Sequence, residues 1–261
     1  MLRSLTATRI LLLKLSKLFT VINFFDCRWS IIGSLFNAKG AIKIKTSTIQ
    51  IINNVIERYP ALEDCRGGLF ASMEIICEGF RNGGKLITCG NGGSAADAMH
   101  IVGELMKGFL LPRKIEKFNP EFVKRAQELF PIDVEFFKAN LQSALPAVSL
   151  VGETSLITAF ANDMSPNLIF AQQIFGLGKR GDVLLAISTS GNSDNVLFAV
   201  EVAKVMGIKV VAMTGRRGGR LRHLSDAAIC VPADSSYTIQ EFHLPIYHMI
   251  CLAAENEFFG D

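Results

Sequence analysis

The sequence predicts an α/β fold with a five-stranded parallel sheet of flavodoxin-like order and helices on both faces. Two observations predict it: five short apolar runs recur after residue 84, and each leads into a helical or turn stretch. Short strands that alternate with helices are typical of parallel sheets. Ligands of such sheets bind outside the carboxyl ends of the strands. The strands are expected at residues 85–89, 147–152, 182–188, 208–214 and 227–231.

Helices are predicted on both sides of these runs. Before the first strand, apolar residues recur every three or four positions, which indicates helices over residues 46–58 and 62–81. The chain ends with a third clear helical pattern, over about residues 239–258. Pro245 lies inside that pattern and has no backbone N–H, so the last helix should bend or break there.

Two segments fall outside the alternation of strands and helices. Residues 107–146 contain Pro112, Pro120 and Pro131 and no strand signal, which predicts a helical insertion, either a lid beside the site or a solvated surface element. Residues 1–45 are apolar and basic, and we interpret them as an extension that is poorly ordered or begins at a non-native start. A surface helix on a membrane, or a cleaved or spanning segment, is the alternative. The regular domain is expected over residues 46–261.

Charge and cysteine content narrow the class of protein. Lys and Arg number 27 against 24 Asp and Glu, so the net charge of +3 gives no sign of a nucleic-acid or membrane partner. The six cysteines form no CxxC pair and no dense framework. In a chain this long they indicate reduced, mostly buried thiols and a cytoplasmic protein.

The loop after the first strand is the most informative segment, with residues 89–104 reading CGNGGSAADAMHIVGE. Gly92 and Gly93 allow a sharp turn and a close approach of the backbone to a ligand. Asn91 precedes them, and Ser94 is expected to cap the helix that follows. The first amides of that helix would then point into the turn, which predicts an anion-binding loop.

Four polar residues on two predicted helices are candidates for metal or proton chemistry. His100 and Glu104 are four positions apart and share one helix face, as two metal ligands or as a base with its orienting partner. Gln240 and His248 lie in the mostly apolar last helix, where a buried, hydrogen-bonded core histidine is the alternative reading. Together these N and O donors would suit zinc. Asp97 is either a second base or an acid that stabilises the helix dipole.

A second loop follows the third strand and reads STSGNS. Ser188, Thr189, Ser190 and Ser193 supply four hydroxyls beside a glycine and the start of a helix, which favours a bound phosphate. The loop has no lysine and lacks the GxxxxGK[ST] pattern, so a monophosphate fits better than a nucleoside triphosphate. The alternative is that such residues only form a turn.

Five motifs in their order carry a family resemblance. Taken together, they resemble the SIS (sugar isomerase) domain family, closest to its phosphoheptose isomerases, over about residues 46–259. The insertion is longer than the usual connection in that family, and the N-terminal extension has no counterpart in it. The motifs are CGNGGSAADAMHIVGEL, AFANDMS, ISTSGNSDNV, GIKVVAMTG and IQEFHLPIYHM.

The resemblance implies a cytoplasmic homotetramer with active sites between subunits, one zinc ion per subunit and a sugar-phosphate substrate. No nucleic acid or membrane partner is expected. The zinc ligands would be His100, Glu104, Gln240 and His248. The substrate-binding residues would be Asn91, Gly92, Gly93, Ser94, Glu104, Asn162, Asp163, Gln240 and, around the phosphate, Ser188, Thr189, Ser190 and Ser193.

The reaction so implied converts sedoheptulose 7-phosphate to D-glycero-D-manno-heptose 7-phosphate through an enediol, for heptose and surface-glycan (lipopolysaccharide) biosynthesis. A ketose–aldose interconversion needs a base near carbon, an acid near oxygen and stabilisation of the enediolate. By resemblance Glu104 is the base and His248 the acid, with Asp97 as a possible second base. A carboxylate fully engaged by zinc is a weaker base, so Glu104 would keep one oxygen free or the metal would be structural.

Two other functions fit the same resemblance. One is a non-catalytic SIS protein that binds a sugar phosphate or a bacterial replication initiator, and the other is an isomerase of a different sugar phosphate. In the initiator-binding branch the histidine of the final helix is replaced. His248 is present here with His100, Glu104 and Gln240, which favours the enzyme.

Overall fold

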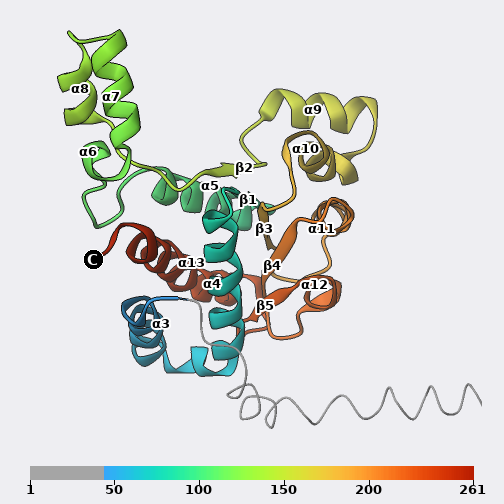
Figure 1. Ribbon diagram of the computed structural model, residues 1–261. Coiled ribbons are helices and arrows are strands. Elements are labelled where there is room, and N and C mark those ends of the chain that lie inside the picture. The colour runs from blue at the N-terminus through green and yellow to red at the C-terminus, as the bar shows by residue number, and fades with distance from the viewer. Residues whose placement is uncertain (1–43) are drawn as a thin grey trace, which may run out of the picture. The chain divides into compact units, whose positions relative to one another are not determined.

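Five parallel strands form the centre of the protein in the computed structural model, which describes residues 44–261 (Figure 1). The sheet order is β2-β1-β3-β4-β5, and every neighbouring pair is parallel. This is the predicted flavodoxin-like order. The strands are β1 Leu86–Cys89, β2 Ala147–Ser149, β3 Val183–Ile187, β4 Lys209–Thr214 and β5 Ala227–Cys230.

The central strand β3 shows why these apolar runs form a sheet that is covered on both faces. All five of its residues are buried. Successive side chains point to opposite faces. Accordingly, Val183, Leu185 and Ile187 belong to one core cluster, and Leu184 and Ala186 belong to the other. The continuous apolar run therefore supplies two cores at once, as expected for a parallel strand between helical layers.

Each face of the sheet is covered by its own helices, as predicted. One core includes residues of α3 Thr46–Arg58, α4 Arg66–Arg81, α5 Gly93–Met106 and α13 Ser236–Phe259. The other includes residues of α10 Ile169–Leu177, α11 Asp194–Val205 and α12 Gly219–Leu224. The remaining elements are η2 Pro60–Cys65, α6 Ile115–Phe118, α7 Pro120–Leu129, α8 Val134–Asn140, α9 Thr154–Asp163 and η3 Pro166–Leu168. None of the helices in this part of the chain is long and apolar enough to cross a membrane.

One helix boundary was predicted wrongly, and of the two outcomes predicted at Pro245 the break is absent. The helix expected from residue 62 begins at Arg66, because Pro60 opens a short 3-10 helix that reaches Cys65 and serves as a tight connector. The last helix continues through Pro245 without a break. The carbonyl that loses its partner there belongs to Glu241, which is exposed, so solvent can take that hydrogen bond.

The prediction of reduced, mostly buried cysteines was confirmed for the described residues. Four of the five cysteines it describes are buried and the fifth, Cys230, is partly buried, all five being free thiols. His223, which lies among arginines, is exposed. Cys27 and almost all of the expected N-terminal extension lie outside the described residues.

The segment between α5 and β2 is helical, as predicted, and projects from the body as α6, α7 and α8 (Figure 1). A bridge between Lys114 and Gln142 joins its two arms at the base. Only Ala126 is buried in α7 and only Val134 in α8. Several large apolar side chains of the insertion are exposed, namely Phe122, Leu129, Phe130, Ile132, Phe136 and Leu141.

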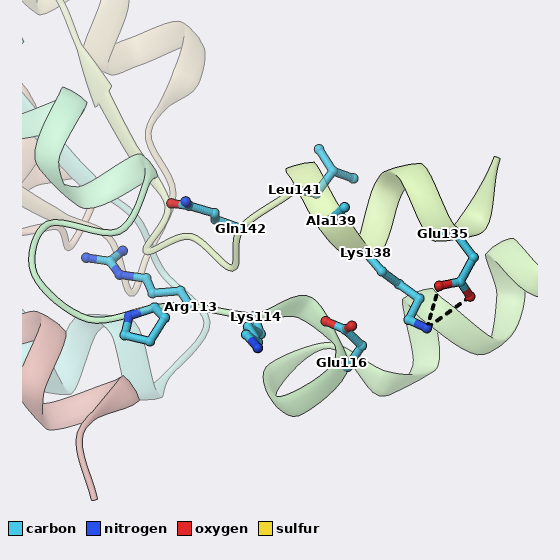
Figure 2. A pocket seen from close by; sticks show the side chains of 9 residues that line it. Arg113, Lys114, Glu116, Glu135, Lys138, Ala139, Leu141 and Gln142 are labelled. Carbon is cyan, nitrogen blue, oxygen red and sulfur yellow. Dashed lines mark hydrogen bonds and ion pairs between the residues drawn. The ribbon is translucent and has the colours of Figure 1, made fainter.

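A cleft of about 450 Å³ lies between the two arms at the base of the insertion (Figure 2). Of its charged side chains, Lys138 pairs with Glu135 at 3.0 Å and Arg113 turns away from the cleft to a buried carboxylate, whereas Lys114 and Glu116 also line it. The cleft is thus an open groove between packed arms, lined by side chains of both charges.

The base of the insertion is fixed to the last helix by Glu255. This carboxylate is 1% exposed and accepts the backbone N–H groups of Phe109, Leu110 and Leu111 as well as Arg113 Nε at 2.8 Å. Burial alone would raise the pKa of Glu255, but these four donors outweigh it and hold the pKa below its usual value. The insertion therefore leaves the body at a rigid point.

Candidate active site

The glycine loop after β1 leads directly into α5. Gly92 has a positive φ of 57°, which favours glycine, and it is the N-cap residue of the helix. The prediction that Ser94 caps α5 was wrong: Ser94 lies inside the first turn and is 3% exposed. Its N–H donates to the Asn91 carbonyl, and that of Ala95 donates to Gly92. The turn is therefore closed by backbone groups.

Gly93 lies directly under the amide of Gln240. A Cβ at Gly93 would stand 2.5 Å from Gln240 Nε2, so the second glycine is needed for the close approach of α13. The loop is also tied to α11, because the side chains of Asn91 and Asn195 exchange two hydrogen bonds of 2.8 and 2.9 Å. Gly93 and Gln240 thus bring the starts of α5 and α13 together.

The hydroxyl loop, defined as Ser188–Ser193, follows β3 at the same edge of the sheet. Ser188 is buried, and its Oγ lies 3.0 Å from Ser193 Oγ. Ser190 Oγ accepts the N–H of Asn192 at 3.2 Å, and Thr189 Oγ1 lies 3.4 Å from Ser236 Oγ at the start of α13. The four predicted hydroxyls are therefore grouped in one turn at the N-terminus of α11.

A glycine pair that the sequence reasoning did not single out supports this loop. Gly191 has φ 65°, and a Cβ there would stand 2.0 Å from the Gly218 carbonyl oxygen. Gly219 is equally close, since its own Cβ would stand 2.5 Å from the Ser190 carbonyl. The signal in the sequence was the Gly-Gly pair of GRRGGR after the fourth strand. The hydroxyl loop thus packs directly against the backbone of the loop after β4.

The imidazole cluster, defined as His100, Glu104, Tyr247 and His248, lies between α5 and α13. His100 Nε2 is 3.2 Å from Glu104 Oε1, and His100 Nδ1 is 3.0 Å from the Tyr247 hydroxyl. The rings of His100 and His248 meet edge to face with centroids 5.3 Å apart. Three of the four predicted metal-ligating residues are therefore adjacent. Tyr247 was not predicted, because it lies in an apolar run and reads as core.

Charges around the cluster shape its protonation. Burial and the neighbouring His100 lower the pKa of His248, and Glu104 partly opposes this. Glu104 Oε2 also accepts Lys107 Nζ at 3.0 Å, so both carboxylate oxygens have partners. Phe109, from the base of the insertion, packs its ring 5.7 Å from that of His248. The insertion thus reaches the cluster through Phe109.

Asp97 lies one turn before His100 on α5. Its Oδ2 is buried without a hydrogen-bond partner. Burial raises the pKa of Asp97 to about 6, and His100 partly opposes the shift. Burial and the charge of Asp97 in turn raise the pKa of Tyr247 to about 12. Asp97 is therefore a carboxyl group that can hold or release a proton near neutral pH.

Helices α5 and α13 run in the same direction and in register. Gly93 meets Gln240 at their starts, and His100 meets Tyr247 two turns later. Two turns correspond to about 10 Å. On one chain the imidazole cluster therefore lies two turns from Gln240 and roughly 18 Å along α13 from Ser236, which touches the hydroxyl loop.

The other predicted residues and the remaining histidine lie apart from the cluster. Asn162 and Asp163 are exposed at the end of α9, where Asn162 Nδ2 donates to Asp163 Oδ1 at 2.8 Å. His243 is fully buried, and neither ring nitrogen has a hydrogen-bond partner of normal geometry. Burial lowers its pKa to about 4, and the nearby Thr214 backbone opposes this slightly. His243 is thus a neutral core residue.

The predicted metal ligands do not converge on one point in the described residues. In residues 44–261 no group of three or more His, Cys, Asp or Glu side chains is arranged closely enough to hold one as it stands. His100 and Glu104 bond to each other, and His248 faces His100 edge to face. The side chains of this trio must therefore turn toward a common point before they can bind a cation, and Gln240 lies two turns away.

The sequence and structure are similar to those of known proteins. A family model described as SIS domain matches residues 124–215. The phosphoheptose isomerase of a Nitratiruptor species is 39% identical over 75% of this chain and 89% of its own length. That of Akkermansia muciniphila is 33% identical over 80% of this chain and 95% of its own length.

Solved structures agree with the sequence relatives. The phosphoheptose isomerase from Francisella tularensis superposes with a TM-score of 0.62 at 30% identity, covering 87% of this chain and 97% of its own. That from Neisseria gonorrhoeae gives 0.60 at 30% identity, covering 80% and 94%. With the glycine loop, the hydroxyl loop and the imidazole cluster in place, these similarities have one reading: the chain belongs to the phosphoheptose isomerase family of SIS-domain proteins.

Proposed function

We propose that this protein interconverts a ketose phosphate and an aldose phosphate, namely sedoheptulose 7-phosphate and D-glycero-D-manno-heptose 7-phosphate, for heptose-containing surface glycans. The observation that carries the proposal is the pairing of His100 and Glu104 on α5 with His248 on α13. Relatives named phosphoheptose isomerase at 33 to 39% identity support the choice of substrate. A cytoplasmic location stays a prediction.

The hydroxyl loop is the proposed phosphate site. Its short hydroxyls lie at the start of α11, where the helix dipole favours an anion. Its internal hydrogen bonds hold Ser188, Ser190 and Ser193 in one turn, so binding costs little further ordering. Asn91, Gly92, Gly93 and Ser94 would hold the sugar end from the neighbouring strand. Roles for Asn162 and Asp163 stay predictions.

Proton transfer is assigned to carboxyl and imidazole groups. A base takes the proton from the carbon beside the carbonyl, and an acid protonates the oxygen, so that an enediol forms. Glu104 is the proposed base, and the exposed Lys107 is the contact it can release most easily to free one oxygen. His248 is the proposed acid. Asp97, with a pKa of about 6, is matched to a proton relay at neutral pH.

Zinc is the proposed metal, and its fit is partial. His100, Glu104 and His248 are donors of the type zinc prefers, and the contact of 3.0 Å between His100 Nδ1 and the Tyr247 hydroxyl is of the kind that orients a metal-binding imidazole. When bound, zinc would stabilise negative charge that develops on the sugar oxygens. Gln240 would complete the set only from another position, because on this chain it lies over Gly93.

The separation of the two halves supports a site shared between subunits. A seven-carbon sugar phosphate is about 10 Å long, given carbon–carbon bonds of about 1.5 Å. Along α13 the loop contact at Ser236 and His248 are roughly 18 Å apart on one chain. One substrate cannot span both, so we propose a homo-oligomer, a tetramer by family resemblance, in which one copy supplies the loop and another the cluster.

The proposal is tested by assaying purified full-length protein with sedoheptulose 7-phosphate, with and without chelator and added zinc. Formation of the aldose that chelator abolishes and zinc restores is the expected result. Turnover that resists the chelator would contradict a catalytic role of the metal but would support the isomerase activity. Sugar-phosphate binding without any turnover would contradict catalysis and favour the non-catalytic alternative.

Sharing of sites is tested by mixing two variants. One carries Ser188→Ala and Ser190→Ala, and the other carries His248→Gln. If sites lie between subunits, co-refolded mixtures contain some sites with both halves intact, and their activity exceeds the sum of the parents. Activity equal to that sum would contradict a shared site.

A further inference from the structure

Tyr247 is a buried phenol whose hydroxyl ends at the imidazole cluster. Its side chain is 2% exposed, and its ring meets that of His100 at 68° with centroids 5.4 Å apart. The hydroxyl lies 3.0 Å from His100 Nδ1. Of the three tyrosines in the chain, Tyr59 and Tyr237 lie elsewhere, and Tyr237 is 71% exposed on the first turn of the same helix.

The two contacts of the His100 ring define where its proton lies. Nε2 faces Glu104 Oε1 at 3.2 Å, and an ionised carboxylate only accepts hydrogen bonds. In the neutral ring Nε2 therefore carries the proton, and Nδ1 has the free lone pair. The Tyr247 hydroxyl then donates to Nδ1, so the phenol selects both the ring orientation and the tautomer.

The same contact can also serve the other tautomer of the ring. If a cation occupies Nε2, the ring proton must lie on Nδ1 and donate to the phenol oxygen. A phenol can donate or accept a hydrogen bond, so the contact of 3.0 Å between Tyr247 and His100 can hold the ring in either form.

We propose that Tyr247 is a positioning residue that holds the His100 ring, as donor to Nδ1 in the metal-free protein and as acceptor from Nδ1 when a cation occupies Nε2. The inference deepens the proposed function, since it assigns the control of metal affinity at that site to Tyr247. The contact joins the buried Tyr247 to the more exposed His100 across two packed helices, so it forms without the substrate.

The test compares Tyr247→Phe with wild type and with Tyr237→Phe, a matched control on the exposed side of α13. Zinc affinity of the full-length protein is measured by competition with a coloured chelator. Tyr247→Phe should bind zinc about 10- to 100-fold more weakly, the range found when a partner of a ligating histidine is removed. Tyr237→Phe should bind zinc as wild type does, and unchanged affinity in Tyr247→Phe would overturn the inference.

A second readout needs no metal and separates the inference from the proposed function. Nitrogen-15 spectra of histidine-labelled, metal-free protein report the tautomer of each of the four histidines. Wild type should show His100 as a single Nε2–H form, and Tyr247→Phe should show a mixture. A single form in Tyr247→Phe would overturn the positioning role, whether or not the protein proves to be an isomerase.

Discussion

The hydroxyl loop and the imidazole cluster are both polar, but they are built in different ways. The loop hangs from the end of a buried strand, and its shape comes from backbone turns that pack against Gly218 and Gly219. The cluster consists of side chains on two helices, and its shape comes from contacts between rings. Consequently, changes of backbone freedom should damage the loop, whereas changes of a single functional group should damage the cluster without unfolding it.

The largest expected effect is on the cluster. His248→Gln removes the proposed acid and should lower kcat by about 10²- to 10⁴-fold, the contribution typical of a positioned acid or base. The fold should survive, because His248 is only partly buried. Steady-state kinetics and circular dichroism measure the two effects. His223→Gln is the exposed control and should be silent, while normal turnover in His248→Gln would remove His248 from the chemistry.

The next effect is on the backbone of the loop. Gly191→Ala places a Cβ at a positive φ and against the Gly218 carbonyl, so it should lower the free energy of unfolding by about 1–3 kcal/mol or more. Gly67→Ala, at the start of α4, meets open space and should raise it by about 0.5–1 kcal/mol. Urea denaturation gives both values. Equal effects would contradict the view that the loop is backbone-determined.

The stability of the fold should depend on pH through the buried His243. The pKa of His243 falls from 6.5 to about 4 on folding, so the unfolded chain binds a proton there first as pH drops. The contribution of neutral His243 to the free energy of unfolding is fully present above pH 6.5. It is lost as pH falls toward 4, a total of about 3 kcal/mol. His243→Met should flatten this part of the stability curve. Denaturation series between pH 4 and 7.5 test it, and parallel curves would contradict the shift.

The smallest effect concerns one hydroxyl of the loop. Ser190→Ala removes one phosphate contact and should weaken sugar-phosphate binding by about 1 kcal/mol, a several-fold rise in KM with kcat little changed. The unphosphorylated sugar is the internal control, since its affinity should stay the same. Calorimetric titration measures both, and unchanged affinity for the phosphate would exclude Ser190 from the site.

The sheet was predictable because each buried strand carries its own signal. β3 is five apolar residues between a charged start and a serine-rich end, and no distant contact is needed to recognise it. The positions of Ser188 and Gly92 at the carboxyl edge follow from the parallel order alone. Sequence spacing also places His100 and Glu104 on one face of α5, since that depends only on helix geometry.

The contacts between elements were not predictable. Tyr247 reads as core until α13 is placed beside α5, and the register that sets it against His100 is fixed by Gly93 and Gln240 at the helix starts. Gly218 reads as part of a turn until Gly191 is found against it. Local patterns determine which face a residue occupies, whereas the partner on another element is determined by packing of the whole domain.

Glu255 fixes the point at which the insertion leaves the rest of the fold. One carboxylate takes up the amides of residues 109–111 and the guanidinium of Arg113, so the chain beyond them starts from the same point whatever its length. We expect that residues 114–142 can be exchanged by grafting, provided that Glu255, its partners and Phe109 are retained. Segments of other lengths would then leave the fold at this point without a change in the imidazole cluster.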